Sequence, residues 1–116
     1  MALYTGTLPT RLLNDQQIRP GSWPTWGHVR REFDRHSEDR KTLAELAASI
    51  RKAGQREPVD LEVDDDGFGV RLADGHHRAL VLMDLGIAEF TFTWCEVGFW
   101  SVKKQRKPFP YHLLGL

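Results

Sequence analysis

Apolar residues recur along this chain with two different periods, and each period predicts a different kind of element. The alternation of apolar with charged residues at Val59, Leu61 and Val63 predicts a strand with one buried face. Four segments are predicted as strands: 3–13 with a break at Pro9, 59–63, 68–72, and 90–97. Between the second and third strands, the Asp-Asp-Asp-Gly sequence at 64–67 predicts a solvated hairpin turn. The Pro-, Gly- and Asn-rich segment 14–24 is predicted to be a loop.

Apolar residues spaced by three and four predict helices elsewhere. Leu43, Leu46 and Ile50 share one helix face, and Thr42 with Glu45 predicts a capping box at the start of that helix. The predicted helices cover 26–40, 42–53 and 76–85. In the last of these, nearly every residue after the first turn is apolar, so this helix should lie deep in the fold.

These elements predict an α/β (α+β) fold, a small mixed sheet with two main helices, near 43–53 and 76–85, packed on it. A length of 116 residues suits one domain with a sizeable core, so 1–116 is predicted to be a single domain. Its last part, 103–116, is predicted to be a tail that is first basic and then apolar.

Charge and cysteine content narrow the class of protein. Lys and Arg number 16, and so do Asp and Glu, so no overall field attracts nucleic acid. The single cysteine, Cys95, excludes an internal disulfide and a cysteine-based zinc cluster. The chain has no membrane-length apolar run and no signal-peptide pattern. We therefore expect a cytoplasmic protein without a membrane partner.

The segment 70–86 combines a strand end, a tight turn at Asp74-Gly75 and a helix with a polar first turn, 76–78. A helix N-terminus carries free backbone N–H donors and the positive end of the macrodipole, which together attract an anion. The guanidinium of Arg78 suits a phosphate or a carboxylate. The sequence therefore predicts a phosphate site here. The plain alternative is a turn into a buried helix whose polar start faces solvent.

This segment resembles the ParB/sulfiredoxin superfamily, in which a strand–Gly–x–x–Arg–helix unit binds nucleotide phosphates. The similarity extends through the Leu-x-x-Ser-Ile type block at 43–54 and covers about 43–97. Relative to that pattern, 23–41 is an insertion. Sulfiredoxin has Gly-Cys-His-Arg, which would place its catalytic cysteine at His76, so the missing thiol argues against that reaction. The Asp-Gly-His-His-Arg form is more similar to the free-serine kinase branch and to phage-borne ParB-like domains.

The resemblance implies a nucleotide-binding domain, of phage or mobile-element origin, that takes ATP, ADP or CTP. The residues it assigns to the nucleotide phosphates are Gly75, His76, His77, Arg78 and, from a looser comparison of the Gln-x-Arg spacing, Arg19. A second class of function is an enzyme, a small-molecule kinase or a nuclease that uses the same pocket. A third class is a module without a ligand that binds a host protein through 23–40 or the tail.

Asp74 and Glu57 are the candidate catalytic acids. Asp74 can act as the helix N-cap, hold Mg²⁺ together with a phosphate, or serve as a base. His76 and His77 are adjacent and point about 100° apart on a helix, so they cannot bind one metal ion together. No metal site made by the protein alone is predicted.

The tail carries a second candidate site. Its candidate nucleic-acid contacts are Lys103, Lys104, Arg106 and Lys107, with aromatic residues nearby, which suits non-specific DNA. The alternative is a solvated tail beside core aromatics. The apolar end, 111–116, is expected to dock on the chain itself or on a second copy in a homodimer.

Overall fold

A computed structural model describes residues 2–64 and 69–116. The predicted turn at 64–67 and the predicted strand start at Phe68 therefore lie largely outside the described residues. The strands are β1 (Gly6–Pro9), β2 (Ile18–Arg19), β3 (Val59–Asp64), β4 (Val70–Asp74), β5 (Glu89–Val97) and β6 (Val102–Lys104). The helices are α1 (Trp26–Arg35), α2 (Ser37–Ala53) and α3 (His76–Asp84), with short 3-10 turns η1 (Thr10–Leu12) and η2 (Tyr111–Leu114).

The strands form one mixed sheet in the order β1-β5-β3-β4-β2, and β6 pairs with β5. β3 is parallel to β5 and β2 is parallel to β4, whereas the other neighbours are antiparallel. β1 and β6 share one edge of β5, because β1 pairs with 89–92 and β6 with 95–97. The predicted mixed α/β fold is confirmed.

The alternation seen in the sequence decides which face of the sheet is buried. Leu61 of β3 lies opposite Leu72 of β4 and Trp94 of β5, and all three are buried, whereas Glu62 and Arg71 on the other face are half-exposed and form an ion pair. Nonpolar burial of this kind is the main favourable term in folding. The sheet thus has one apolar and one polar face.

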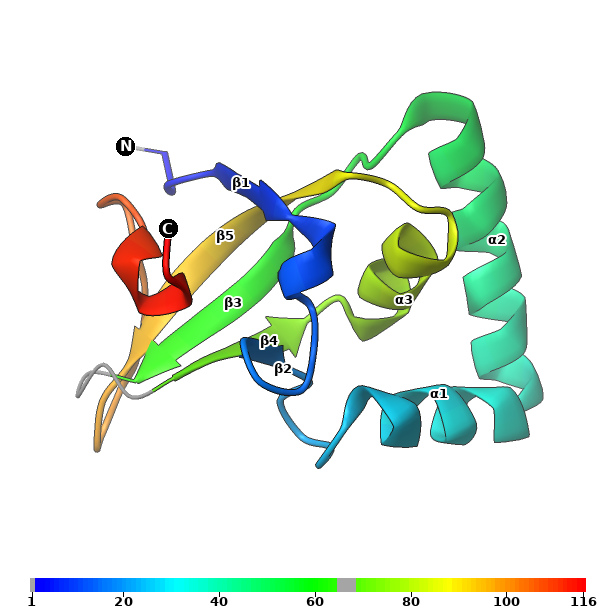
Figure 1. Ribbon diagram of the computed structural model, residues 1–116, viewed down its shortest axis with the longest axis horizontal. Coiled ribbons are helices and arrows are strands. Elements are labelled where there is room, and N and C mark those ends of the chain that lie inside the picture. Colours follow the sequence, from blue (N-terminus) through cyan, green and yellow to red (C-terminus); the bar gives the residue numbers. More distant parts are fainter. Residues whose placement is uncertain (1, 65–68) are drawn as a thin grey trace.

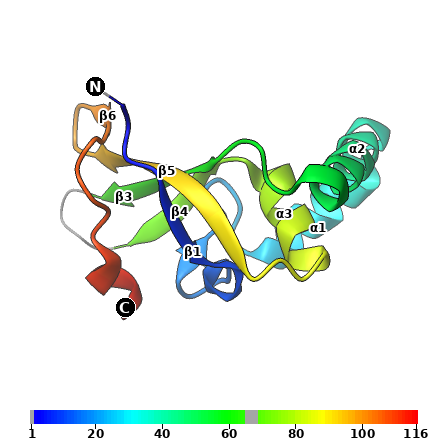
Figure 2. The ribbon, with the colours of Figure 1, turned by 90° about the horizontal axis from the view of Figure 1, so that it is seen from above.

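The helices gather at one end of the sheet (Figures 1 and 2). α3 lies between the sheet and α2, and its residues Ala79 to Leu82 are all buried, as the apolar run predicted. α1 confirms the helix predicted within 26–40. The prediction of two main helices packed on the sheet needs one correction, because α2 packs mainly on α3 and α1.

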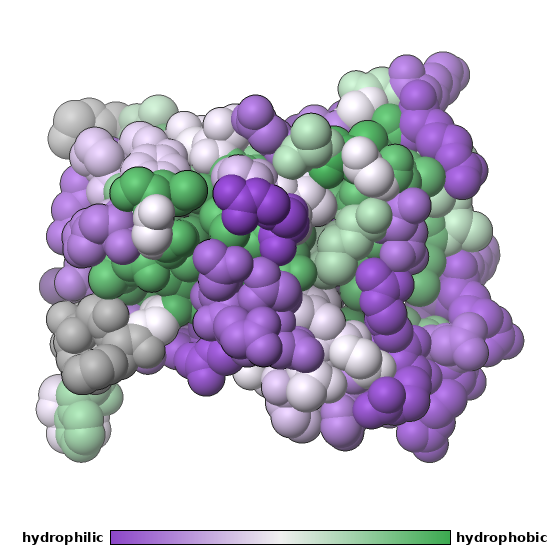
Figure 3. All heavy atoms as spheres, in the orientation of Figure 1, coloured by the Kyte–Doolittle hydropathy of each residue, from purple (hydrophilic) through white to green (hydrophobic). Residues whose placement is uncertain are grey.

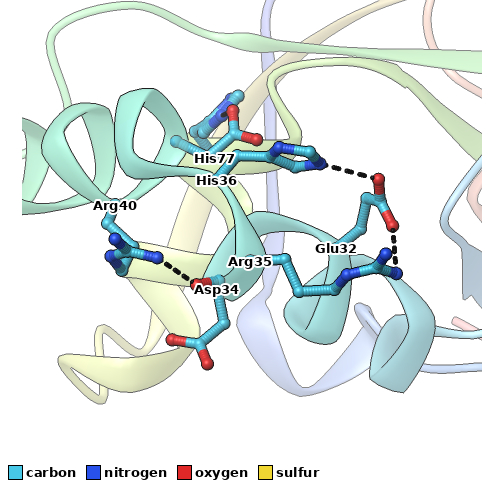
Figure 4. Close-up of polar contacts among 7 residues, drawn as sticks. Glu32, Asp34, Arg35, His36, Arg40 and His77 are labelled. Atoms are coloured by element: carbon cyan, nitrogen blue, oxygen red, sulfur yellow. Dashed lines mark hydrogen bonds and ion pairs between the residues drawn. The ribbon is translucent and has the colours of Figure 1, made fainter.

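The boundary between the first two helices also differs from the prediction. α1 ends at Arg35, and α2 begins at Ser37, ahead of the predicted start at Thr42. Thr42 is not the N-cap, because its hydroxyl donates to the Glu38 carbonyl within the helix. Figure 4 shows the polar contacts at this corner. They are an ion pair between Glu32 and Arg35, a hydrogen bond between Glu32 and His36, and a hydrogen bond from Arg40 to the Asp34 carbonyl.

Two segments are more regular than predicted. The loop 14–24 contains β2, and the indole N–H of Trp26 donates to the Ile18 carbonyl beside it. The tail docks on its own chain, since Phe109 and Leu114 are buried and the hydroxyls of Tyr111 and Tyr4 lie 2.7 Å apart. No helix among the described residues is both long enough and apolar enough to span a membrane.

Candidate functional site

The turn from β4 into α3 requires a glycine. Gly75 is the N-cap of α3 and has the left-handed φ of 98°. A Cβ at this position would lie 2.8 Å from Cγ1 of Val59, so a side chain is excluded by space as well as by conformation. No side chain of the described residues caps the helix, and Asp74 is exposed. The first-turn N–H groups of α3 therefore keep their capacity to bind an acceptor.

A cleft of about 640 Å³ opens beside this helix end. One wall is the motif itself, Asp74 to Arg78, and the opposite wall is α2. The remaining lining residues are Trp23, Phe33, Thr42, Glu45, Leu46 and Ser49. The sequence signal for the α2 wall was present, because Thr42, Glu45 and Ser49 fall at i, i+3 and i+7 on one helix face. Two of these residues had instead been interpreted as a capping box.

Arg78 lies on the cleft wall and is engaged by another residue. Its guanidinium is 3.3 Å from a carboxylate oxygen of Glu57 and 3.4 Å from the Pro58 carbonyl. The Arg78 side chain is 20% exposed, but that of Glu57 is 77% exposed. An ion pair with so exposed a partner contributes little, since solvent screens it. Arg78 is thus paired only with a solvent-exposed carboxylate, and Glu57 lines a smaller hollow of about 190 Å³ next to it.

His77 joins the three helices. Its ring is stacked on Phe33 of α1, with centroids 4.1 Å apart and planes 7° apart. Its Nε2 is 2.8 Å from a carboxylate oxygen of Asp39 on α2. Sequence reasoning missed both partners, because they lie far from His77 along the chain. The His77 ring therefore fixes the cleft wall, and its Nε2 is already engaged.

His76 points under the loop that precedes α1. Its ring packs against Trp23 and Trp26, with centroid distances of 4.9 and 6.1 Å. Its Nε2 is buried and has no partner among the described residues. Burial lowers the pKa of His76 below its ordinary value, although the backbone of Pro20 and the charge of Asp74 act in the opposite direction. Burial therefore favours the neutral form of the ring, which packs against the two indoles.

The other predicted site residues are distributed unevenly. Asp74 lines the cleft, and so does Glu45, a carboxylate that the sequence did not single out. Arg19 lies at the opposite end of β4, where its guanidinium is close to Gly69. Over residues 2–64 and 69–116, no group of three or more His, Cys, Asp or Glu could hold a metal ion. Asp74 and Glu45 are the two carboxylates that line the cleft.

The basic run of the tail lies at the far end of the sheet from the helices (Figure 1). Lys103 and Lys104 belong to β6 and are exposed, as is Arg106. Lys107 is 3.1 Å from a carboxylate oxygen of Glu96, and its Nζ lies 5.7 Å from the centre of the Trp94 ring. The run is therefore a part of the hairpin β5–β6 and its exit, separate from the cleft.

Cys95 is buried in β5, and its thiol contacts the Asp60 carboxylate and the Leu61 carbonyl. Burial, together with the neighbouring carboxylates, raises the pKa of Cys95 to about 12. Because the thiolate is the reactive form, this cysteine is inert at neutral pH.

Comparison with solved structures finds the same fold in sulfiredoxin from Arabidopsis thaliana, with a TM-score of 0.57 and 22% sequence identity. The alignment covers 82% of this chain and 88% of that chain. The chain therefore has a sulfiredoxin-like fold, and the fold implied by the resemblance in the motif is confirmed. No protein-family model and no curated protein matches the sequence.

Proposed function

We propose that the cleft at the N-terminus of α3 binds the phosphates of a nucleotide. The observation that carries this proposal is the uncapped first turn of α3, which opens on a cleft with Arg78 on its wall. A helix N-terminus without a side-chain cap offers N–H donors and a positive potential to an anion. The cleft volume, about 640 Å³, lies in the range of small-molecule sites.

The side chains around the first turn have different roles in this proposal. The amides of 76–78 bind phosphate oxygens, and Arg78 exchanges Glu57 for the phosphate. A phosphate carries more charge than one exposed carboxylate and accepts a paired hydrogen bond from the guanidinium. Trp23 and Phe33 give the cleft an apolar wall for the rest of the ligand. His76 and His77 hold the wall in place through their rings, so only their backbone amides contact the ligand.

Calorimetric titration with ATP, ADP and CTP, with and without Mg²⁺, tests the proposal. We expect saturable binding that Arg78→Ala weakens about tenfold or more, because hydrogen bonds to charged groups are the strong ones. Arg51→Ala is the matched control, since Arg51 is exposed on α2 outside the cleft lining. Glu57→Gln should strengthen binding, because it releases Arg78. Absence of binding at millimolar nucleotide, or equal effects of the two arginine variants, would contradict the proposal.

Phosphoryl transfer within the same cleft is a second candidate function. It is favoured by Asp74, which is exposed, lines the cleft and is not the helix cap. A carboxylate in this place can accept the proton of an acceptor hydroxyl, and with Glu45 it can hold Mg²⁺ on the phosphates. Asp74→Asn should then abolish turnover of ATP with hydroxyl compounds and leave nucleotide binding without Mg²⁺ in place. Equal turnover in this variant and the parent protein would exclude the role.

A further inference from the structure

The turn between β5 and β6 exposes two large aromatic side chains. Phe99 is 86% exposed and Trp100 is 91% exposed, and the neighbouring Val102 is also exposed. Among the described residues, no other aromatic side chain is as open; Phe90, Phe92, Trp94 and Phe109 are buried. Figure 3 shows this tip as a pale protrusion at the lower left of the molecule. Two adjacent open aromatic rings offer faces on which a planar group can stack.

The two rings are presented by an ordered hairpin. Val97 pairs with Val102 across β5 and β6, and the Gly98 amide donates to the Ser101 carbonyl at 2.8 Å. The ring centroids of Phe99 and Trp100 lie 4.6 Å apart, and the ring planes meet at 84°. Because the rings are nearly perpendicular, each ring offers a flat face of its own.

Positive charge follows directly after the aromatic tip. Lys103, Lys104 and Arg106 are exposed and form no ion pair within the described residues. Glu96 lies across the strand pair from Lys103 and forms its ion pair with Lys107, at 3.1 Å. The described part of the hairpin thus combines open ring faces with exposed cations.

We infer that the β5–β6 hairpin binds single-stranded nucleic acid. Bases stack on the open faces of Phe99 and Trp100, and the phosphates contact Lys103, Lys104 and Arg106. Stacking on aromatic side chains with cations along the backbone is how proteins bind single strands with little sequence preference. The inference does not depend on the proposed nucleotide cleft, which lies at the other end of the molecule.

The same features argue against a duplex and against a bilayer. In a duplex the bases stack on one another and cannot stack on the tip, and the α-helices that could enter a major groove lie at the opposite end (Figure 1). Insertion into a bilayer is favoured by a continuous apolar surface. Here the apolar surface is small, the rings are perpendicular, Ser101 separates Trp100 from Val102, and Lys103 follows at once.

Fluorescence anisotropy with a labelled single-stranded oligonucleotide tests the inference on the full chain. The informative variant is Phe99→Leu/Trp100→Leu, which keeps apolar side chains at the tip and removes both ring faces. We expect it to weaken binding about tenfold or more, since stacking is the lost contribution. Lys103→Ala/Lys104→Ala should weaken binding and reduce the slope of log affinity against log salt by about 1.4. Lys52→Ala, an exposed lysine on α2, is the matched control and should change neither quantity.

Three outcomes would overturn the inference. The first is an unchanged oligonucleotide affinity in the leucine double variant. The second is equal or tighter binding of a blunt duplex of the same length. The third is the absence of oligonucleotide binding together with sedimentation on anionic phosphatidylserine vesicles, which would assign the tip to a membrane surface. Because both substituted rings are almost fully exposed, the double variant should fold normally, and thermal unfolding confirms this before binding is measured.

Discussion

Phe33 and Phe99 are both phenylalanines, and they lie at opposite ends of the molecule. Phe33 is 5% exposed, stacks on His77 and lines the cleft, whereas Phe99 is 86% exposed and contacts Trp100 at the hairpin tip. The cations differ in the same way, because Arg78 is half-buried and paired, and Lys103 is exposed and unpaired within the described chain. An aromatic residue and a cation thus form part of a cleft wall at one end and of a solvent-exposed tip at the other.

The largest expected effect is a difference in protein stability between alanine variants of the two phenylalanines. Phe33→Ala should lower the free energy of unfolding by about 3 kcal/mol or more, because it leaves a cavity and removes the stacking partner of His77. Phe99→Ala should change it by less than about 0.5 kcal/mol, because the ring is already in water. Chemical denaturation measures both. Equal losses in the two variants would remove the contrast between the ends.

A smaller effect is expected at the helix start. Gly75→Ala should cost about 2 kcal/mol of stability, because alanine is strained at positive φ and its Cβ meets Val59. Gly115→Ala is the control. Gly115 is also left-handed, with φ 77° and ψ 21°, but no atom lies within 4 Å of the added Cβ, so this variant carries the conformational cost alone. If the two variants lose the same stability, the close approach to Val59 has no energetic weight.

The smallest effect is a dependence of protein stability on pH, which tests whether the His76 ring is buried. Its pKa is lowered in the folded state, so the unfolded chain binds a proton more readily. Stability should therefore be complete above the unfolded pKa of about 6.5 and fall as the pH drops through that value toward the lowered folded pKa. Denaturation at pH 7.5 and pH 5.5 should show a loss in the parent protein that is reduced in His76→Gln. An identical pH dependence in both proteins would place the titration elsewhere.

The sequence predicted well those features that depend on neighbouring residues. The alternation in β3, the apolar run of α3 and the Gly75 turn each depend on a short stretch of chain, and each was found as expected. The start of α2 was placed too late because Thr42 and Glu45 satisfy a capping pattern inside a continuing helix. β2 was missed because a strand of two residues is too short to show an alternation of apolar and polar residues. Only its pairing with β4 identifies it as a strand.

The site was predicted less completely, because its geometry depends on contacts between distant segments. The Gly75–Arg78 motif does line a cleft, but nothing local indicated that Glu57 would reach Arg78 or that Asp39 and Phe33 would hold His77. Arg19 was grouped with the motif by spacing alone, and the parallel pairing of β2 with β4 carries it to the other end of the strand. Binding residues on separate elements become visible only once the topology is known.

The position of Trp23 supplies the molecule with an internal optical reporter. The indole lies on the cleft wall in edge contact with both His76 and Phe33. Its emission responds to any molecule that displaces water from that wall, and Trp23→Phe identifies its share among the four tryptophans. Occupancy of the cleft can thus be followed in the unlabelled protein, at concentrations too low for calorimetry.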